Sequence, residues 1–531
     1  MNAKMTPRFW LALMVCLIAV YPPAHHSIGA IAFPQESKLD LLIRGGTVLD
    51  GSGSPAVRTD VGIRGDRIAF IGDAAKSVIS ATRTIDATGL VVAPGFIDPH
   101  THTFEDLSDA KRKTNENYLL QGVTTVITGN DGGGPIHITE VLEKWEKQGI
   151  GTNAGLLVGQ GTVRGQVMKM SDADPTPDQL AQMKRLVAQA MDEGALGIST
   201  GLYYAPGSYA KTEEIIELAT VAAQRGGIYD SHMRDESSYT IGLLGSIRET
   251  IRIGREAKIP VHISHIKALG ADVWGQSVEA IAIINKALAE EIDVTADQYP
   301  YTASGSSLAA SLIPRWAEVG GREELLKRID DPQTRSRLIA EMEANLKRRG
   351  GAESLLITSG RNKRLIGKTL AVISKQRSQA PVEAALEIIK AGGAGVASFN
   401  MNEKDIENFM KQSWVMTGSD GSTGHPRKYG TFPRKLREYV FNKRVITLQF
   451  AIHASSKLTA ETFRLRERGE LKLGYFADVI VFDEKTIADR ATYDHPEELA
   501  VGMKYVIVNG RVAVEDGKYA GALAGRAIRR R

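Results

Sequence analysis

Cysteine is almost absent from this chain. The only one among 531 residues is Cys16, so the chain beyond it can form no disulfide and offers no thiolate to a metal ion. A lipoprotein anchor at Cys16 is disfavoured, because Val15 precedes it where a small residue would be expected.

An excess of charge of one sign is also missing. The 66 lysines and arginines nearly balance the 62 aspartates and glutamates, which leaves a net charge of +4. Part of that excess lies in the arginine-rich end at 526–531, which we expect to be a solvated tail. We therefore predict no nucleic-acid binding. With 43% hydrophobic and 24% charged residues, the composition is that of a globular enzyme.

The N-terminal apolar run, residues 9–20, is shorter than the roughly 20 residues that a membrane span needs. Lys4 and Arg8 precede the run, and a stretch of small residues that ends at Ala30 follows it. This layout is typical of a secretory signal peptide. We predict a signal peptide over residues 1–30, export to the periplasm or medium, and no stable membrane span after cleavage.

Both ends of the remaining chain are rich in short β segments separated by Gly-Gly, Asp-Gly and Gly-Asp turns. Three lie near the start and two near the end: 39–50, 60–72, 84–89, 476–482 and 501–510. Periodicity alone indicates two β-rich ends.

Between these ends, apolar strand candidates alternate with helical patterns, which favours parallel βα units. Eight strands are predicted, at 91–98, 123–129, 154–159, 195–199, 227–231, 260–265, 292–297 and 414–418. Helical patterns occupy 177–193, 213–225 and 278–291. We predict an α/β fold with a (β/α)8 TIM-like barrel over 91–465, whose chemistry lies at the carboxyl ends of the strands. The interval 301–413 is too long for one connection and contains helical patterns at 322–349 and 381–390, so we predict an inserted subdomain before the last strand.

The first barrel strand ends in a distinctive way. Val91 to Ile97 forms an apolar run that predicts a buried strand, and Asp98, His100 and His102 follow it. Side chains at i and i+2 of a strand point the same way, so the two imidazoles project together and suit a divalent transition metal. With 11 histidines in the chain, however, such a pair arises by chance in roughly one chain in five.

Three further strands end in polar residues that a metal site could use. Tyr-Asp-Ser-His ends at His232, His-Ile-Ser-His at His265, and Met-Thr-Gly-Ser-Asp at Asp420. His262 faces the opposite way from His265, and we interpret it as a packing residue. Each has a structural alternative: a barrel-mouth histidine for His232, and a turn former for Asp420.

The stretch 93–102, Ala-Pro-Gly-Phe-Ile-Asp-Pro-His-Thr-His, resembles the first-strand signature of the amidohydrolase superfamily. Within it, the chain from about residue 38 resembles the D-aminoacylases, or N-acyl-D-amino-acid deacylases. This resemblance implies a (β/α)8 barrel and a small β-sandwich formed by 38–90 and 466–531. It also implies metal ligands on strands one, five, six and eight, in the order found here.

Two positions depart from common family patterns. Many binuclear members carry a carboxylated lysine at the end of strand four, but this strand ends Gly-Ile-Ser-Thr-Gly at 197–201. D-aminoacylases have a cysteine after strand two, in Gly-Asn-Cys-Gly, where this chain has Asp131. A carboxylate still binds zinc, although it is a harder ligand than thiolate. The alternative for Asp131 is a turn residue in a glycine-rich loop.

The resemblance implies one or two zinc ions, held by His100, His102, Asp131, His232 and His265, with Asp420 as general acid and base. It also implies that Lys267, Tyr299 and Arg427 bind the substrate carboxylate, because they match the family's Ser-His-x-Lys, strand-seven tyrosine and arginine segments. The expected activity is hydrolysis of small N-acyl-D-amino acids to a carboxylate and a free D-amino acid. The alternatives are a dipeptidase, a cyclic-amide hydrolase, or a catalytically silent binding protein on this scaffold.

Overall fold

The computed structural model describes residues 38–530. The predicted signal peptide and Cys16 lie outside these residues. Within them, every helix is too short or too polar to cross a membrane.

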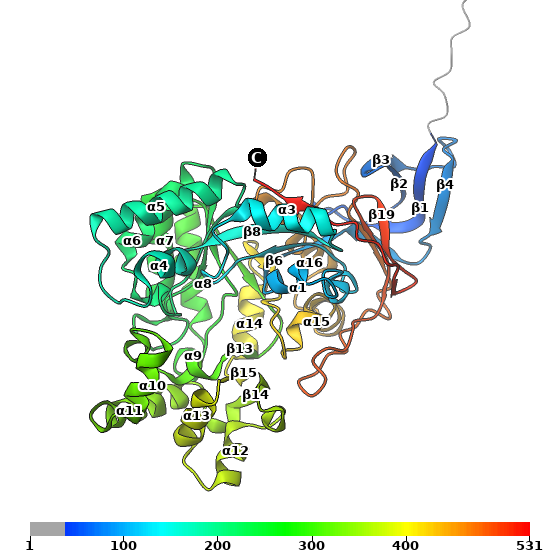
Figure 1. Ribbon diagram of the computed structural model, residues 1–531. Helices are drawn as coiled ribbons and strands as arrows, with labels where there is room; N and C mark the ends of the chain where they lie inside the picture. Colours follow the sequence, from blue (N-terminus) through cyan, green and yellow to red (C-terminus); the bar gives the residue numbers. More distant parts are fainter. Residues whose placement is uncertain (1–37, 531) are drawn as a thin grey trace, which may run out of the picture. The chain divides into compact units, whose positions relative to one another are not determined.

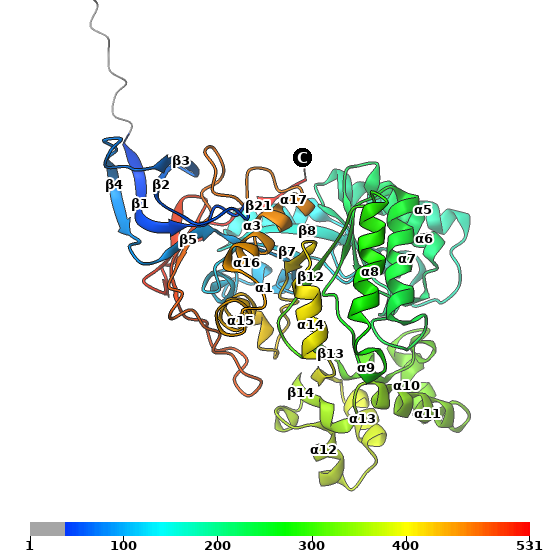
Figure 2. The same cartoon turned by 180° about the vertical axis from the view of Figure 1, so that it is seen from behind.

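The predicted barrel is confirmed as eight parallel strands that follow one another around a ring (Figures 1 and 2). A bridge between Thr101 and Gly421 joins the last strand to the first and closes the ring. The strands are β6 (Phe96–Thr101), β7 (Val123–Thr128), β8 (Asn153–Gly159), β9 (Gly197–Gly201), β10 (Ile228–His232), β11 (Val261–Ile263), β12 (Val294–Gln298) and β16 (Val415–Thr417).

Amphipathic helices cover the barrel. Four consecutive ones, α5 (Pro177–Asp192), α6 (Thr212–Ala223), α7 (Gly242–Ala257) and α8 (Ser277–Ala289), pack side by side (Figure 2). The helical patterns predicted at 177–193, 213–225 and 278–291 correspond to α5, α6 and α8. At α5, a reciprocal capping box between Thr176 and Gln179 fixes the first turn.

We predicted that the apolar run from Val91 to Ile97 forms one strand, but it contains parts of two. β5 (Val91–Pro94) pairs with the β domain, and β6 begins at Phe96 in the barrel. The change of sheet falls at Gly95, where an added Cβ would lie 2.2 Å from Thr124 Oγ1. Only glycine allows this close approach of the first strand to its neighbour.

Both ends of the chain meet in one nine-stranded sheet. β17 (Val479–Phe482) pairs antiparallel with β5, and so joins the C-terminal strands to the N-terminal ones. Apolar side chains from both ends share one core, as the predicted β domain requires. The other strands are β1 (Leu39–Val48), β2 (Val57–Arg64), β3 (Arg67–Gly72), β4 (Ala81–Asp86), β18 (Met503–Val508), β19 (Arg511–Glu515) and β20 (Lys518–Tyr519).

The segment before the last barrel strand forms a subdomain with its own apolar core. It contains an antiparallel sheet of β13 (Ala303–Ser307), β15 (Ala394–Phe399) and β14 (Leu355–Gly360), with helices α9 (Leu308–Leu312), α10 (Arg322–Asp330), α11 (Pro332–Arg348), α12 (Leu370–Arg377) and α13 (Pro381–Lys390) (Figure 1). The chain has returned to the barrel by α14 (Glu403–Met410), which packs on α8 and β12. The insertion therefore ends before residue 413.

We expected the arginine-rich end to be a solvated tail, but it packs on the barrel. β21 (Ala527–Ile528) adds to β8, Arg529 forms an ion pair with Glu146, and Arg530 donates to the Met191 carbonyl at 2.6 Å. These arginines lie beside the C-terminal carbonyls of α5 and a surface carboxylate, a context that composition does not reveal.

Candidate metal centre

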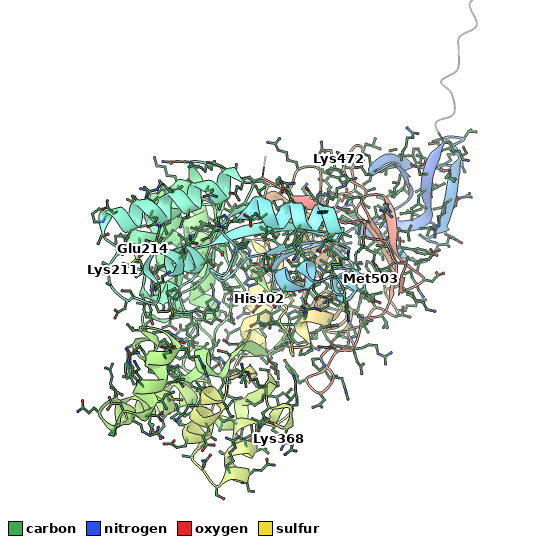
Figure 3. The ribbon with its side chains drawn as sticks, viewed as in Figure 1. His102, Lys211, Glu214, Lys368, Lys472 and Met503 are labelled. Atoms are coloured by element: carbon green, nitrogen blue, oxygen red, sulfur yellow. The ribbon has the colours of Figure 1, made fainter. Side chains whose placement is uncertain are left out.

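The polar residues predicted at four strand ends converge at the mouth of the barrel. His100 lies in β6 and His232 ends β10, while His265 and Asp420 follow β11 and β16. Parallel strands present their carboxyl ends at one face, so residues up to 320 positions apart meet there. His102, also at the end of the first strand, is labelled near the centre of Figure 3, above the inserted subdomain. These side chains are buried except that of His102, which is 37% exposed.

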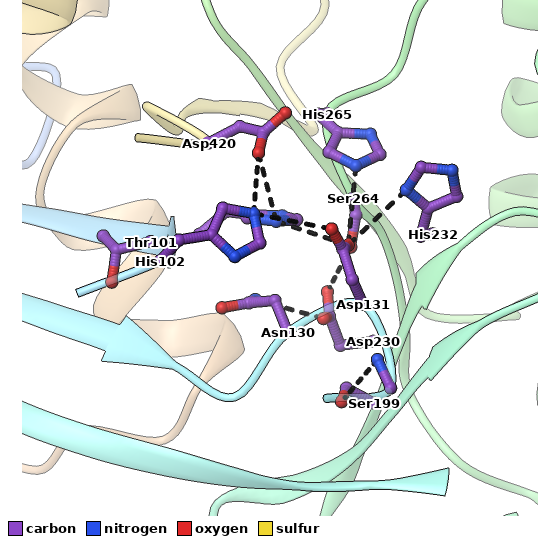
Figure 4. A network of polar contacts seen from close by, with 12 residues as sticks. Thr101, His102, Asn130, Asp131, Ser199, Asp230, His232, Ser264, His265 and Asp420 are labelled. Carbon is purple, nitrogen blue, oxygen red and sulfur yellow. Dashed lines mark hydrogen bonds and ion pairs between the residues drawn. The ribbon is translucent and has the colours of Figure 1, made fainter. Parts of the chain in front are cut away.

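Asp131 stands between the histidines (Figure 4). Its Oδ1 lies 3.4 Å from His100 Nε2 and 3.6 Å from His232 Nδ1. The same oxygen lies 3.5 Å from His265 Nε2, and Oδ2 lies 3.5 Å from His102 Nε2. Two ligands on one tetrahedral zinc, each bonded at about 2.0–2.1 Å, stand about 3.4 Å apart. The spacing is therefore that of ligands around a metal ion.

Several of these atoms have no hydrogen-bond partner although they are buried. Asp131 Oδ1, His100 Nε2 and His232 Nδ1 are all unpaired. Buried polar atoms nearly always have a hydrogen-bond partner in folded proteins. Several unpaired polar atoms that point toward one another therefore indicate a ligand between them. Their chemistry, imidazole nitrogen and carboxylate oxygen, fits zinc.

The residues form two groups that share Asp131. One holds His100, His102, Asp131 and Asp420, and the other holds Asp131, His232 and His265, with ligand atoms within 4.8 Å of one another in each. A carboxylate common to both groups can bridge two ions. The geometry thus accommodates either one or two metals.

The backbone is strained at three positions of the centre. Asp131, His265 and Asp420 have φ values of 56°, 36° and 46°, in the left-handed region. Asparagine, aspartate and histidine adopt this region more often than other residues with a side chain, but it is uncommon for all of them. Strain of this kind persists where function requires a side chain to be aimed in one direction.

Two carboxylates of the centre are held in the ionised form. Burial alone would raise the pKa of the Asp131 carboxyl, but His100 and His232 outweigh it and hold the pKa well below its usual range. At Asp420, burial is likewise outweighed by Arg427 and His265, and the pKa is lowered. Both carboxylates are therefore ionised, which is the form that binds a metal ion.

Asp420 links the metal centre to the predicted substrate residues. Its Oδ1 lies 3.0 Å from His102 Nε2, and its Oδ2 lies 2.8 Å from Arg427 Nη1. Arg427 is buried and its guanidinium lies over the ring of Tyr299, 4.6 Å from the centroid. The Tyr299 hydroxyl reaches the sulfur of Met401 at 3.6 Å.

A cavity of about 830 Å³ opens over the centre. Eight of the nine predicted site residues line it, and His100 lies behind them. The opposite wall comes from the inserted subdomain, through β13, β14 and β15. The barrel supplies the reactive groups, and the subdomain encloses the space in front of them.

Comparison with known proteins agrees with this geometry. A model described as "Amidohydrolase family" matches residues 83–514. The chain belongs to the amidohydrolase family. A D-aminoacylase of Alcaligenes xylosoxydans xylosoxydans is 36% identical over 92% of this chain and 98% of its own length.

Solved structures give the same result. A D-aminoacylase structure matches this amidohydrolase with a TM-score of 0.80 and 36% identity, covering 93% of this chain and all of the other. An N-acyl-D-glutamate deacylase of Bordetella bronchiseptica, complexed with zinc and a phosphonate inhibitor, matches with a TM-score of 0.79 and 31% identity, at 93% and 100% coverage.

A further residue of this amidohydrolase, Glu236, was missed by the sequence analysis. Its Oε1 lies 3.1 Å from His265 Nδ1 and 2.5 Å from Lys267 Nζ, and its Oε2 lies 3.8 Å from His232 Nε2. The carboxylate therefore contacts the outward ring nitrogens of two predicted ligands and leaves the inward nitrogens for metal. The spacing of four residues between His232 and Glu236 was the available signal, but it carries little weight without the loop geometry.

Replacing Glu236 by glutamine is expected to weaken metal binding by about 10- to 100-fold, because the outward partner of a ligating histidine fixes its orientation and basicity. Metal affinity measured by competition with a chelator tests this. Glu249→Gln is the matched control, since Glu249 is a largely buried carboxylate that pairs with Arg234 and forms no ion pair with a histidine in the described chain. If Glu236→Gln and the wild type had equal affinities for the metal, Glu236 would have no role in metal binding.

Lys267 is already engaged in this structure. Its ammonium contacts Glu236 and lies 2.7 Å from His265 Nδ1, although it also lines the cavity. It therefore supports the second metal group as well as facing the space where a substrate would bind.

Polar residues beneath the centre hold the first strand in place. His262, interpreted as a packing residue, contacts Thr295 Oγ1 at 3.0 Å and Asp297 Oδ2 at 2.9 Å. Asp297 Oδ2 also lies 3.7 Å from His100 Nδ1. Asp297 thus supports His100 from below, a role that needed the tertiary contact to be seen. Burial raises the pKa of the neighbouring Asp98 to about 7.

Residues 197–201, Gly-Ile-Ser-Thr-Gly, have the spacing of a serine-hydrolase nucleophile motif. Ser199 does not serve as one, because its hydroxyl donates to the Gly129 carbonyl at 2.5 Å and accepts from Gly132 N at 3.2 Å. In the described chain no histidine is hydrogen-bonded to it. Ser199 instead anchors the loop that carries Asp131.

Proposed function

We propose that this amidohydrolase hydrolyses the amide bond of N-acyl-D-amino acids, with zinc as cofactor, to release a carboxylate and a free D-amino acid. One observation carries the proposal: the Asp131 carboxylate lies at ligand spacing from four imidazoles at the mouth of the barrel. The similarity to D-aminoacylase over nearly the whole chain supports the substrate class.

Asp131, His232 and His265 would hold one zinc ion, and His100 and His102 would hold a second with Asp131 and Asp420. Bound zinc supplies Lewis acidity, which polarises an amide carbonyl and lowers the pKa of water to roughly 7. Asp420 is ionised and faces the cavity, so its carboxylate can accept a proton from attacking water and return it to the departing amine.

Arg427 orients the other end of the substrate. It is buried at the cavity wall, and its guanidinium presents paired donors that match a carboxylate. A substrate α-carboxylate beside Arg427 would lie next to Asp420, which places the scissile amide within reach of the base. Tyr299 packs under the guanidinium and fixes its plane. Lys267 remains a candidate second contact.

A panel of N-acetyl amino acids in both enantiomers tests the function. We expect release of free amine from D but not L substrates, at a rate that follows the zinc content of the protein. Turnover of dipeptides or cyclic amides alone would support the corresponding alternative hydrolase. A zinc-loaded protein that releases no amine from any substrate would be a silent binding protein.

Methyl esters of good substrates are expected to be poor. Removing the α-carboxylate charge should lower kcat/KM at least about tenfold, since a hydrogen bond between charged groups contributes roughly 1.5–3 kcal/mol and about 1.4 kcal/mol corresponds to tenfold. Lys267→Met should also raise KM if its ammonium shares the carboxylate. Lys428→Met is the matched control, because Lys428 is a buried lysine paired with Asp106 outside the cavity wall. Equal turnover of acid and ester would exclude a carboxylate anchor.

We also propose that the protein is exported to the periplasm or medium. The charged start, short apolar run and small residues up to Ala30 support this. Cell fractionation and N-terminal sequencing of the protein from its expression host test it, and a cytosolic protein that retains residues 1–30 would contradict it.

A further inference from the structure

The subdomain wall of the cavity carries arginines that form no ion pair with a carboxylate. Arg322, Arg349 and Arg361 line it. None of them forms an ion pair with a carboxylate in the described part of the chain, and Arg322 donates instead to the carbonyls of Ile389 and Lys390 at the end of α13. By contrast, the two cations on the barrel side, Lys267 and Arg427, are paired with carboxylates. The subdomain therefore adds positive charge that the protein itself does not neutralise.

Arg349 is the deeply placed member of the three. It follows α11 and is only 2% exposed, whereas Arg322 and Arg361 are exposed. Its Nη2 donates to the Tyr203 hydroxyl at 3.1 Å, but Nε and Nη1 are buried and have no hydrogen-bond partner. A buried guanidinium with unused donors is costly, and an anion that binds there would offset the cost.

Arg349 is close to the metal centre through Tyr203. The Tyr203 ring stacks on His232 with 5.8 Å between centroids, and its hydroxyl receives the Arg349 hydrogen bond. A ligand group beside Arg349 is thus about one tyrosine length from His232.

Arg349 and Arg427 lie on opposite sides of the barrel mouth. Tyr203 follows β9, and Arg427 contacts Asp420, which follows β16. In the ring of strands, β9 is four places from β16 in either direction. A substrate bound at the centre has one cation on each flank.

Building on the proposed function, we propose that Arg349 binds a second carboxylate of the substrate. The preferred substrates are then N-acyl-D-amino acids with a negative charge besides the α-carboxylate, carried either by the side chain or by the acyl group. A guanidinium forms strong charge-assisted hydrogen bonds with a carboxylate, and Arg349 has Nε and Nη1 without a partner to donate one.

Two isosteric pairs test the proposal on the wild-type zinc enzyme. N-acetyl-D-glutamate is compared with N-acetyl-D-glutamine, and N-succinyl-D-alanine with its terminal amide. We expect kcat/KM to be at least about tenfold higher for the diacid in one pair, since that is the usual effect of one buried charged hydrogen bond. The pair that shows the preference identifies the side chain or the acyl group as its source.

In the pair that shows the preference, the variant Arg349→Gln should reduce the ratio of kcat/KM for the diacid to kcat/KM for its amide to near one. Arg348→Gln is the matched control, because it removes the same charge one residue away, from a side chain that faces Asn345 and Tyr239 and does not line this cavity. The control should keep the ratio. A ratio near one in both pairs for the wild type overturns the proposal, even if Arg349→Gln fails to fold.

A preference for the diacid that persists in Arg349→Gln also overturns the proposal, because another residue would then bind the second carboxylate. Hydrolysis of N-acetyl-D-alanine with no preference for diacids refutes this inference alone. No hydrolysis of any N-acyl-D-amino acid refutes the proposed function, and the inference with it.

Discussion

Asp420→Asn is expected to lower kcat by about 100-fold or more while the protein folds and retains metal at Asp131, His232 and His265. Asparagine keeps the shape of the side chain but cannot accept a proton, and general acid–base catalysis typically contributes 10²- to 10⁴-fold. Asp420 is not in the second metal group, so the zinc held there should remain. Steady-state kinetics, metal analysis and thermal unfolding on one preparation measure the three effects.

The control for this variant is Asp489→Asn. Asp489 is a buried carboxylate paired with Arg434 and Arg437, much as Asp420 is paired with Arg427, but it does not line the cavity. It should cost stability and leave kcat near the wild-type value. If Asp420→Asn retained activity within a few-fold of the wild type, Asp420 would have no part in proton transfer.

Asp131→Ala is expected to lose metal in dialysis against a chelator concentration that the wild type survives. Without the shared carboxylate, His232 and His265 would be two neutral ligands left to hold a dication, and metal binding is coupled to this negative charge. Activity should fall with the metal and return in part when zinc is added. The measurement is zinc per chain after dialysis.

Asp131→Asn separates the ligand role from a turn role. Asparagine suits the left-handed backbone at φ 56° as well as aspartate does, so a turn residue would tolerate the change. A metal ligand would not, because the charge is lost. Full zinc retention by Asp131→Asn would mean that Asp131 is not a ligand. Asp131→Cys should bind zinc at least as tightly as the wild type, since thiolate is the softer ligand, although cysteine is less stable in this backbone conformation.

Local patterns in the sequence were sufficient for the barrel and for most of the centre. The alternation of apolar strand patterns with amphipathic helix patterns predicted the eight barrel strands, because the spacing of apolar residues within a short segment indicates which positions are buried. A parallel barrel then brings strand ends together whatever their separation along the chain, so His100, His232, His265 and Asp420 had to meet. Asp131 was predicted only from its family resemblance, at the place of a cysteine.

Contacts between distant segments decided the rest. The sequence does not reveal that Gly95 divides one apolar run between two sheets, because the reason is Thr124 on the neighbouring strand. Nor does it reveal that Glu236 contacts His265, that Arg427 is paired with Asp420, or that Arg349 is buried with two unpaired donor nitrogens. The partner of a charged side chain depends on which loops the fold brings together. Periodicity records whether a residue is buried, whereas only the tertiary structure determines what it is buried against.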